Sequence, residues 1–305
     1  MNTETLALER AASRSPVLAQ MLLCSFLWAT SFLLMKLIGA DLAPLPLTAL
    51  RGLMGGGLLA LWVMWRGQPV LPKGREWRDW AVLGLLQGLI PNTLTAYALT
   101  QIAAGLTSMM QATAPLMVAV LAHFLFADER LSPRRLCGVL VGFAGMAVLI
   151  GPSGDSLQSG SFWGPLAMIV TAVSYALGSL YVRSIPVAEP ARLALGQQAF
   201  SGIPATLAVL VFFGPQAFAA APEHLLALSA LGIFATALPI VLFMSILRRA
   251  GPTLGSMNGY LTPAWTVLLG FLVLGETTSL HEIAGGIIVL LGVLLANERR
   301  PIRPK

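Results

Sequence analysis

Ten apolar runs, most of them about twenty residues long, follow one another along the chain with short polar connections between them. A helix needs roughly 20 apolar residues to cross the hydrocarbon core of a bilayer. This pattern therefore predicts an all-α integral membrane protein with ten transmembrane helices and no soluble domain. The predicted spans are residues 17–38, 44–66, 80–100, 104–126, 134–150, 161–182, 190–213, 225–247, 252–274 and 280–296.

The composition excludes the main soluble classes of protein. Only 10% of the 305 residues are charged and 56% are hydrophobic, whereas a soluble domain carries about 25% charged residues. No zinc-protease helix, nucleophile elbow or phosphate-binding loop is present in the sequence. We therefore predict that the protein is not an enzyme and that it has no cofactor and no metal site.

The basic residues predict the orientation of the chain in the membrane. Of the 19 Lys and Arg residues, 17 lie on the side of the N-terminus when the connections are assigned alternately to two sides. Lys36 lies at the opposite end of the first span, and Arg51 lies within the second span. By the positive-inside rule both termini are cytoplasmic. We expect a multi-pass protein of a bacterial inner membrane. The protein has a net charge of +6, and we expect its basic residues to contact lipid headgroups and not nucleic acid.

The two halves of the chain resemble each other at constant offsets. Because five spans are an odd number, the second half enters the membrane from the opposite side, which predicts an inverted repeat with a binding site near the midplane. We expect a cytoplasmic tail over 1–16, repeats over 17–150 and 161–296, an extracytoplasmic linker over 151–160 and a cytoplasmic tail over 297–305. The matched positions are Trp28–Lys36 with Tyr175–Arg183, Pro91 with Pro239, Pro115 with Pro263, Glu129 with Glu276, Gly138 with Gly285 and Gly145 with Gly292.

Four motifs give the chain its resemblance to a known family. They are Trp28…Lys36, Arg51-Gly52-Leu53, Ala127-Asp128-Glu129-Arg130-Leu131 followed by Gly138, and Leu274-Gly275-Glu276 followed by Gly285. With these motifs, residues 17–296 resemble the EamA-type members of the drug/metabolite transporter superfamily. Among them the chain is similar to bacterial exporters of aromatic amino acids. The resemblance implies two five-helix repeats that alternate between two open conformations around a small-molecule substrate.

The acidic residues predict how transport is energised. All 13 lie in tails, connections or span ends, and none lies in the middle of a span. Proton-coupled exporters of organic cations usually need a buried carboxylate that pairs with the cation. We therefore predict no obligatory proton coupling. His123 is the only His inside a span, and we expect it to form a local hydrogen bond, with a proton-carrying role as the alternative.

Polar and aromatic residues inside the spans are the candidate substrate-binding residues. For each residue alone, a bond to a neighbouring helix is the alternative. As a set, amides, hydroxyls and aromatic rings suit a net-neutral, amphipathic solute. The candidates are Trp28, Ser31, Gln87, Asn92, Tyr97, Gln111, Tyr175, Thr236, Asn258 and Trp265.

Two further groups inside the spans allow more than one interpretation. Pro91, Pro115, Pro239 and Pro263 each lie near the middle of a span, as hinges or as static kinks. Lys36 and the Arg51 side chain are expected to reach toward the membrane interface. Arg51 could instead bond near Gln198, its counterpart in the second half, and either cation could bind a substrate carboxylate.

The sequence thus predicts an alternating-access exporter of small neutral or zwitterionic metabolites, above all aromatic and other neutral amino acids. A multidrug or sugar-derivative carrier of the same fold is the alternative, and a channel or membrane-embedded enzyme is a more distant one. We expect a monomer, with a dimer as the alternative.

Overall fold

The structure is a computed structural model that describes residues 3–126, 131–150, 162–182, 184–185, 189–243, 246 and 258–296. These residues form helices joined by turns, and they contain no strand. The predicted linker over 151–160 and the C-terminal tail over 297–305 lie outside the described residues.

Helices occupy all ten predicted spans. Three of the spans contain more than one helical element, because the type of helix changes or the helix breaks inside them. In chain order the elements are α1 (Thr3–Ile38), α2 (Pro44–Trp65), α3 (Glu76–Leu83), η1 (Gly84–Leu89), α4 (Ile90–Gln101), α5 (Ala104–Gln111), α6 (Ala114–Leu125), α7 (Pro133–Ile150), α9 (Trp163–Val182), α10 (Pro190–Phe212), η3 (Pro215–Phe218), α11 (Leu225–Gly232), η4 (Ile233–Ala237), α13 (Asn258–Leu274) and α14 (Leu280–Ala296).

The lengths of these helices fit a membrane protein. Among the described residues, seven segments are long and apolar enough to cross a bilayer, and Leu261–Leu274 and Leu280–Ala296 are shorter apolar helices. The prediction of an all-α membrane protein with ten helical spans is confirmed. The first apolar span, Val17–Ile38, has the predicted bounds, and α1 extends beyond it at its N-terminal end to Thr3.

Three of the four mid-span prolines lie next to irregular helix. The π-helical segments η1 and η4 end two residues before Pro91 and Pro239. Proline lacks an N–H and clashes with the carbonyl four residues earlier, and a wider π-helical turn relieves both problems. Pro115 follows a break at residues 112–113 between α5 and α6, whereas Pro263 lies inside α13. The role of these prolines as hinges stays a prediction.

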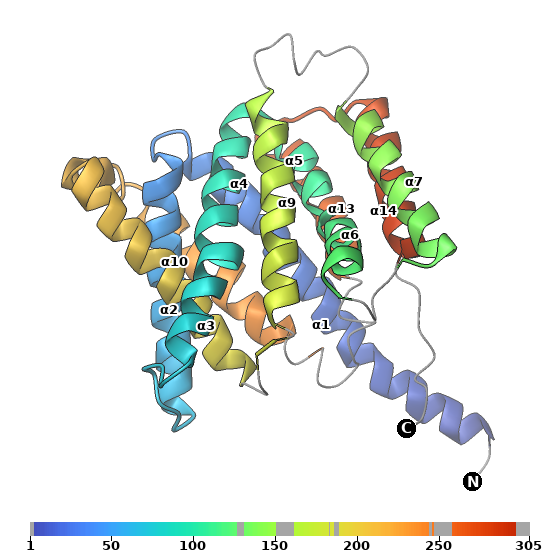
Figure 1. The fold of residues 1–305 in the computed structure, drawn as a ribbon, viewed down its shortest axis with the longest axis horizontal. Coiled ribbons are helices and arrows are strands. Elements are labelled where there is room, and N and C mark those ends of the chain that lie inside the picture. Colours follow the sequence, from blue (N-terminus) through green and yellow to red (C-terminus); the bar gives the residue numbers. More distant parts are fainter. Residues whose placement is uncertain are drawn as a thin grey trace.

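The helices pack in pairs that draw on both halves of the chain (Figure 1). α2 lies along α10 at one side of the bundle, and α7 lies along α14 at the other. Between these pairs, α4 packs against α9, α1 packs against α13, and α9 also contacts α5 and α6. Lipid is as apolar as a leucine side chain, so close packing and small residues hold such helices together.

Glycines allow α7 and α14 to approach closely. A Cβ added to Gly138 would lie 2.4 Å from the backbone nitrogen of Ala296, and one added to Gly285 would lie 2.5 Å from that of Leu149. Both contacts are too short for any side chain, so the two backbones touch there. Gly138 and Gly285 are 147 residues apart, and so are Leu149 and Ala296, so the same offset relates the two contacts.

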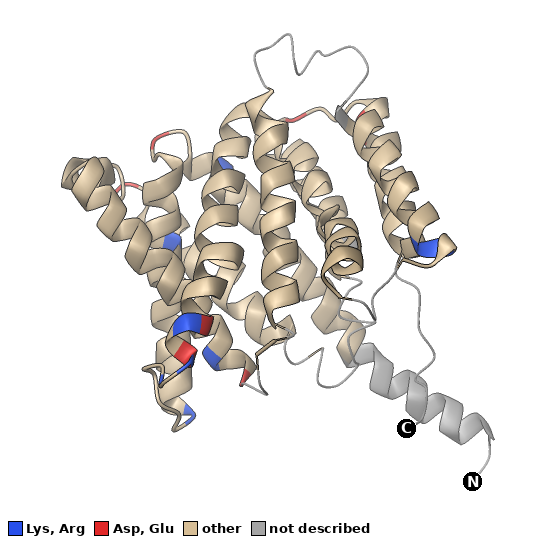
Figure 2. Ribbon diagram, in the orientation of Figure 1, with Lys and Arg blue, Asp and Glu red and all other residues tan. Residues whose placement is uncertain are grey.

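Charged residues gather at the two ends of the helices (Figure 2). At the end predicted to face the cytoplasm, Arg192 pairs with Glu76 at 2.6 Å, and the hydroxyl of Tyr181 donates to Asp79 at 2.7 Å. Asp79 and Arg192 are only 4% and 8% exposed. The sequence predicts these residues at span ends but not their burial, which depends on the contact between α3 and α10.

Candidate substrate site between the helices

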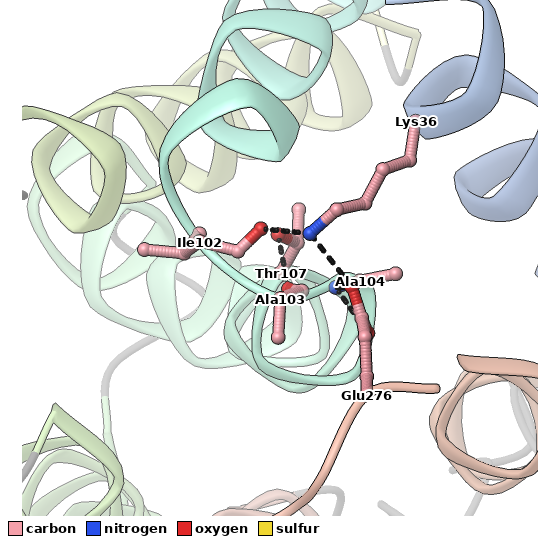
Figure 3. A network of polar contacts seen from close by, with 6 residues as sticks. All are labelled: Lys36, Ile102, Ala103, Ala104, Thr107 and Glu276. Carbon is pink, nitrogen blue, oxygen red and sulfur yellow. Dashed lines mark hydrogen bonds and ion pairs between the residues drawn. The ribbon is translucent and has the colours of Figure 1, made fainter. Parts of the chain in front are cut away.

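One ion pair joins three separate segments beside the C-terminal end of α1 (Figure 3). Lys36 Nζ lies 2.6 Å from Glu276 Oε1 and donates to the carbonyl of Ile102 at 2.9 Å. The backbone N–H of Ala104 donates to both oxygens of Glu276, at 2.9 and 3.1 Å. We call these four residues the Lys36–Glu276 network. It connects α1 to the turn between α4 and α5 and to the turn between α13 and α14.

The Lys36–Glu276 network is largely removed from solvent. The side chains of Lys36 and Glu276 are 29% and 13% exposed, so water screens their attraction less than it screens a surface pair. The sequence predicts that Lys36 extends toward the interface, and the structure instead engages it in this ion pair. The partners are distant in sequence, so only the fold brings them together.

A hollow of about 230 Å³ lies next to the same network. Lys36 is part of its wall, and Met35 is another part that is only 2% exposed. The residues around the hollow are Met35, Lys36, Gly39, Ala40, Leu99 and Thr100, from the ends of α1 and α4.

Arg51 lies behind Met35, inside the bundle. Its Nε donates to the hydroxyl of Thr236 at 2.9 Å, and its Nη1 donates to the sulfur of Met35 at 3.2 Å. Thr236 is 2% exposed and donates its own hydroxyl hydrogen to the carbonyl of Leu231 at 2.8 Å. Tyr175 on α9 lies within electrostatic reach of the guanidinium. Arg51 therefore bonds across to η4, and among the described residues its hydrogen-bond partners are Thr236 and Met35 and not its counterpart in the second half, Gln198.

Two of the predicted binding residues have buried polar atoms without partners. Ser31 and Asn258 are 4% and 1% exposed, and neither the Ser31 hydroxyl nor either amide atom of Asn258 makes a hydrogen bond of standard geometry among the described residues, where the thiol of Cys24 lies beside the Asn258 amide. Asn92, which follows Pro91 directly, is 4% exposed. Unpaired buried polar groups cost free energy, so groups of this kind suit a site where a solute or water completes the bonding.

The predicted aromatic residues lie along the contacts of α1. Trp28 packs against Phe243 with ring centroids 5.2 Å apart, and Trp265 of α13 packs edge-on against Phe26 at 5.5 Å. Tyr97 packs partly buried against a hydrophobic cluster built around the fully buried side chains of Leu116 and Met168.

The predicted amides on η1 and α5 have other surroundings. Gln87 donates to the hydroxyl of Ser179 at 3.3 Å and packs against Gly178, where an added Cβ would lie 2.4 Å from the Gln87 side chain. This is a contact between helices of the kind named above as the alternative. Gln111 is half-buried at the last position of α5.

The His inside the fourth span makes a local contact. The Nδ1 of His123 accepts the backbone N–H of Leu131 at 3.1 Å, a local hydrogen bond of the predicted kind. In the part of the chain that the structure describes, no group of three His, Cys, Asp or Glu side chains could hold a metal ion.

Comparisons with known proteins add a family to this geometry. The model of the EamA-like transporter family matches the chain twice, over residues 16–151 and over residues 161–297. The chain is 30% identical to the chloroplastic WAT1-related protein At3g02690 of Arabidopsis thaliana, over 89% of this chain and 67% of that protein. It is 28% identical to the "uncharacterized inner membrane transporter YedA" of Escherichia coli, over 92% and 90% of the two chains.

The fold also matches a solved structure. One crystal structure aligns with a TM-score of 0.64 over 93% of this chain and 96% of its own, at 23% identity. At that identity the match supports the fold alone.

Proposed function

The chain belongs to the EamA-like transporter family, and from this premise we propose an alternating-access carrier that exports small neutral or zwitterionic metabolites. Aromatic and other neutral amino acids are the proposed substrates. The proposed setting is a bacterial inner membrane with both termini in the cytoplasm. The relative named an inner membrane transporter and the 17 basic residues on one side support this setting.

Two observations support an inverted pair of five-helix repeats. The family model matches each half of the chain once. The contact of Gly138 with Ala296 recurs as the contact of Gly285 with Leu149 at the same offset of 147 residues. A two-fold relation between the halves produces such reciprocal contacts, as it does at an isologous interface. Inverted repeats of this kind allow two related conformations, each open to one face.

The choice of substrate class rests on one observation: in the part of the chain that the structure describes, the polar groups in the middle of the bundle are uncharged apart from Arg51. Ser31 and Asn258 carry unpartnered polar atoms, and Trp28 lies about one helical turn before Ser31 on α1 and offers an aromatic ring. Amides and hydroxyls can hydrogen-bond the ends of an amino acid, and aromatic faces can stack on its side chain.

The positions of the carboxylates support transport without obligatory proton coupling. Among the described residues, the buried Asp79 bonds to Tyr181 and the half-buried Glu276 bonds to Lys36, and both lie at the ends of spans. Each of them already has a partner, so neither is poised to exchange a proton with a substrate in the middle of the bundle.

Counterflow in proteoliposomes tests the proposal. Vesicles that contain the purified full chain are loaded with an unlabelled amino acid, and the entry of labelled Phe, Trp, Thr and Met is followed with and without a protonophore. Saturable exchange that survives the protonophore is the expected result. Exchange that stops when the protonophore is added contradicts transport without proton coupling. If folded protein exchanges no amino acid, the amino acid proposal fails and drugs and sugar derivatives become the candidate substrates.

A further inference from the structure

We propose that Arg51 binds the carboxylate of the transported solute, an inference that rests on the proposed function. The bound solute would then be an organic acid or an amino acid, and a simple amine or a neutral drug would bind poorly. The carboxylate would approach the part of the guanidinium that the protein leaves unused.

Arg51 is a charged residue inside a span, and the described residues provide no counter-ion for it. It lies seven residues after Pro44, or about 10 Å along α2 at 1.5 Å per residue. Among the described residues no carboxylate lies within 4.0 Å of it, and its partners Thr236 and Met35 are neutral. Charged side chains within spans usually pair with each other or line a solute pathway. The missing partner indicates the second role.

The geometry of the guanidinium suits a carboxylate. Arginine has five N–H donors, of which Thr236 and Met35 use two, so three remain. Two parallel donors can bind both oxygens of one carboxylate, which is stronger than a bond between neutral groups. Thr236 is held in turn by the Leu231 carbonyl, so it fixes the orientation of the guanidinium. The thioether sulfur of Met35 is only a weak acceptor, which a carboxylate oxygen can replace.

The surroundings of Met35 indicate a path for release. Met35 contacts Arg51 and also belongs to the wall of the hollow that contains Lys36. A carboxylate that leaves Arg51 past Met35 enters this hollow beside the second cation. There it competes with Glu276 for Lys36, which weakens the Lys36–Glu276 network. Release toward the extracytoplasmic side and opening of that side would thus be coupled through Lys36.

A purely structural role is the competing explanation, because Arg51 also connects α2 to η4 through Thr236. A structural brace affects folding and all substrates equally. A binding residue changes the preference for solutes that carry a carboxylate, so the measurement must compare solutes that differ only in that group.

The test uses counterflow of labelled phenylalanine in proteoliposomes with four competitors. Phenylalanine and 3-phenylpropionate carry the carboxylate, whereas phenylalaninamide and phenethylamine lack it. The wild type should be inhibited by the first two at concentrations about 10- to 100-fold lower than by the last two, the effect of one charge-assisted pair of hydrogen bonds. Arg51→Gln should remove this preference, and Arg51→Lys should retain part of it because the charge remains.

Thr236→Val removes the bond to Nε and leaves the charge, so it separates loss of the contact between α2 and η4 from loss of the cation. It should retain part of the preference for carboxylates, because Thr236 orients the guanidinium but does not carry the charge. Equal inhibition of the wild type by phenylalanine and phenethylamine overturns the proposal. The proposal is also overturned if Arg51→Gln prefers carboxylates as strongly as the wild type does. It is overturned as well if Arg51→Lys keeps the full preference while Thr236→Val loses it.

A second measurement separates this inference from the proposed function. Thermal unfolding of the detergent-solubilised chain is followed with a panel of aromatic and aliphatic carboxylates, each beside its amide. If no amino acid is transported, the substrate proposal fails. The Arg51 inference then stands if a carboxylate stabilises the wild type more than its amide and this difference disappears in Arg51→Gln. It fails if no carboxylate does so.

Discussion

Removing the charge of Glu276 should open the extracytoplasmic side of the bundle. The carboxylate pairs with Lys36 at 2.6 Å and accepts the Ala104 N–H, and the two charged side chains are 13% and 29% exposed. In Glu276→Gln one amide oxygen can still accept the Ala104 N–H, but the attraction to Lys36 is lost. For a pair that is neither fully buried nor at the surface, we expect a loss of about 1 to 2 kcal/mol. This corresponds to a roughly 5- to 30-fold change in the ratio of closed to open states.

Cysteine labelling measures this change directly. The reporter is Ser31→Cys in a chain whose Cys24 and Cys137 are replaced by alanine, because Ser31 is 4% exposed and should react slowly when this side is closed. A membrane-impermeant maleimide added from the extracytoplasmic side should label the reporter about 5- to 30-fold faster in Glu276→Gln. Glu223→Gln is the control, since Glu223 is exposed. An unchanged labelling rate in Glu276→Gln refutes the assignment of this ion pair to closure.

The proposed inverted repeat predicts a second variant with the opposite effect on the labelling rate. The offset of 147 maps Lys36 to Arg183 and Glu276 to Glu129, two residues that lie outside the described part of the chain. From the sequence pattern alone, Glu129→Gln should favour the state open to the cytoplasm and slow the labelling of Ser31→Cys. Faster labelling in both variants contradicts an inverted relation between the two halves.

Four other substitutions test the hinges, the site and the helix packing, and Gly57→Ala is a control for the last. Pro91→Ala and Pro239→Ala should each slow counterflow more than they lower the unfolding temperature, because the π-helical turn before each proline provides the bend; normal flux with a lower unfolding temperature contradicts the hinge role. Asn92→Ala should raise the KM for phenylalanine several-fold in a monodisperse protein, because one buried amide near Pro91 is lost, and an unchanged KM removes Asn92 from the site. Gly138→Ala should destabilise the chain by about 1 to 3 kcal/mol in thermal or denaturant unfolding, because its Cβ would lie 2.4 Å from the Ala296 nitrogen, whereas Gly57→Ala meets nothing within 4 Å and should be neutral or stabilising.

The positions of the spans could be predicted because a bilayer imposes one length and one polarity on every helix. The details at the prolines could not. A proline removes one donor in every case, but the chain responds with a π-helical turn before Pro91, a break before Pro115 and a continuous helix at Pro263. The response depends on which neighbouring helix fills the space, and that information lies in contacts between distant segments.

The site was harder to predict than the fold because a polar side chain in a span can face either a binding site or a neighbouring helix. The sequence predicts Gln87 in the binding site, and in the structure it bonds to Ser179. The sequence predicts that Arg51 reaches toward the membrane interface, and in the structure it bonds to Thr236. A signal for Arg51 did exist in the sequence. Gly55 lies one helical turn further along α2, on the same face, and a Cβ there would lie 3.2 Å from the Thr236 side chain.

A small residue one turn from a charge marks the face on which another helix approaches, so the charge points into the bundle and away from lipid. A guanidinium on that face needs a partner, because a charge is costly in a low-dielectric interior unless it is paired. Among the described residues the fold supplies only a hydroxyl and a thioether. This arrangement suits the proposed binding of a solute carboxylate. A permanent carboxylate of the protein at this position would compete with the solute. Weak neutral partners orient the cation and leave it free to bind an anion that arrives and departs in each transport cycle.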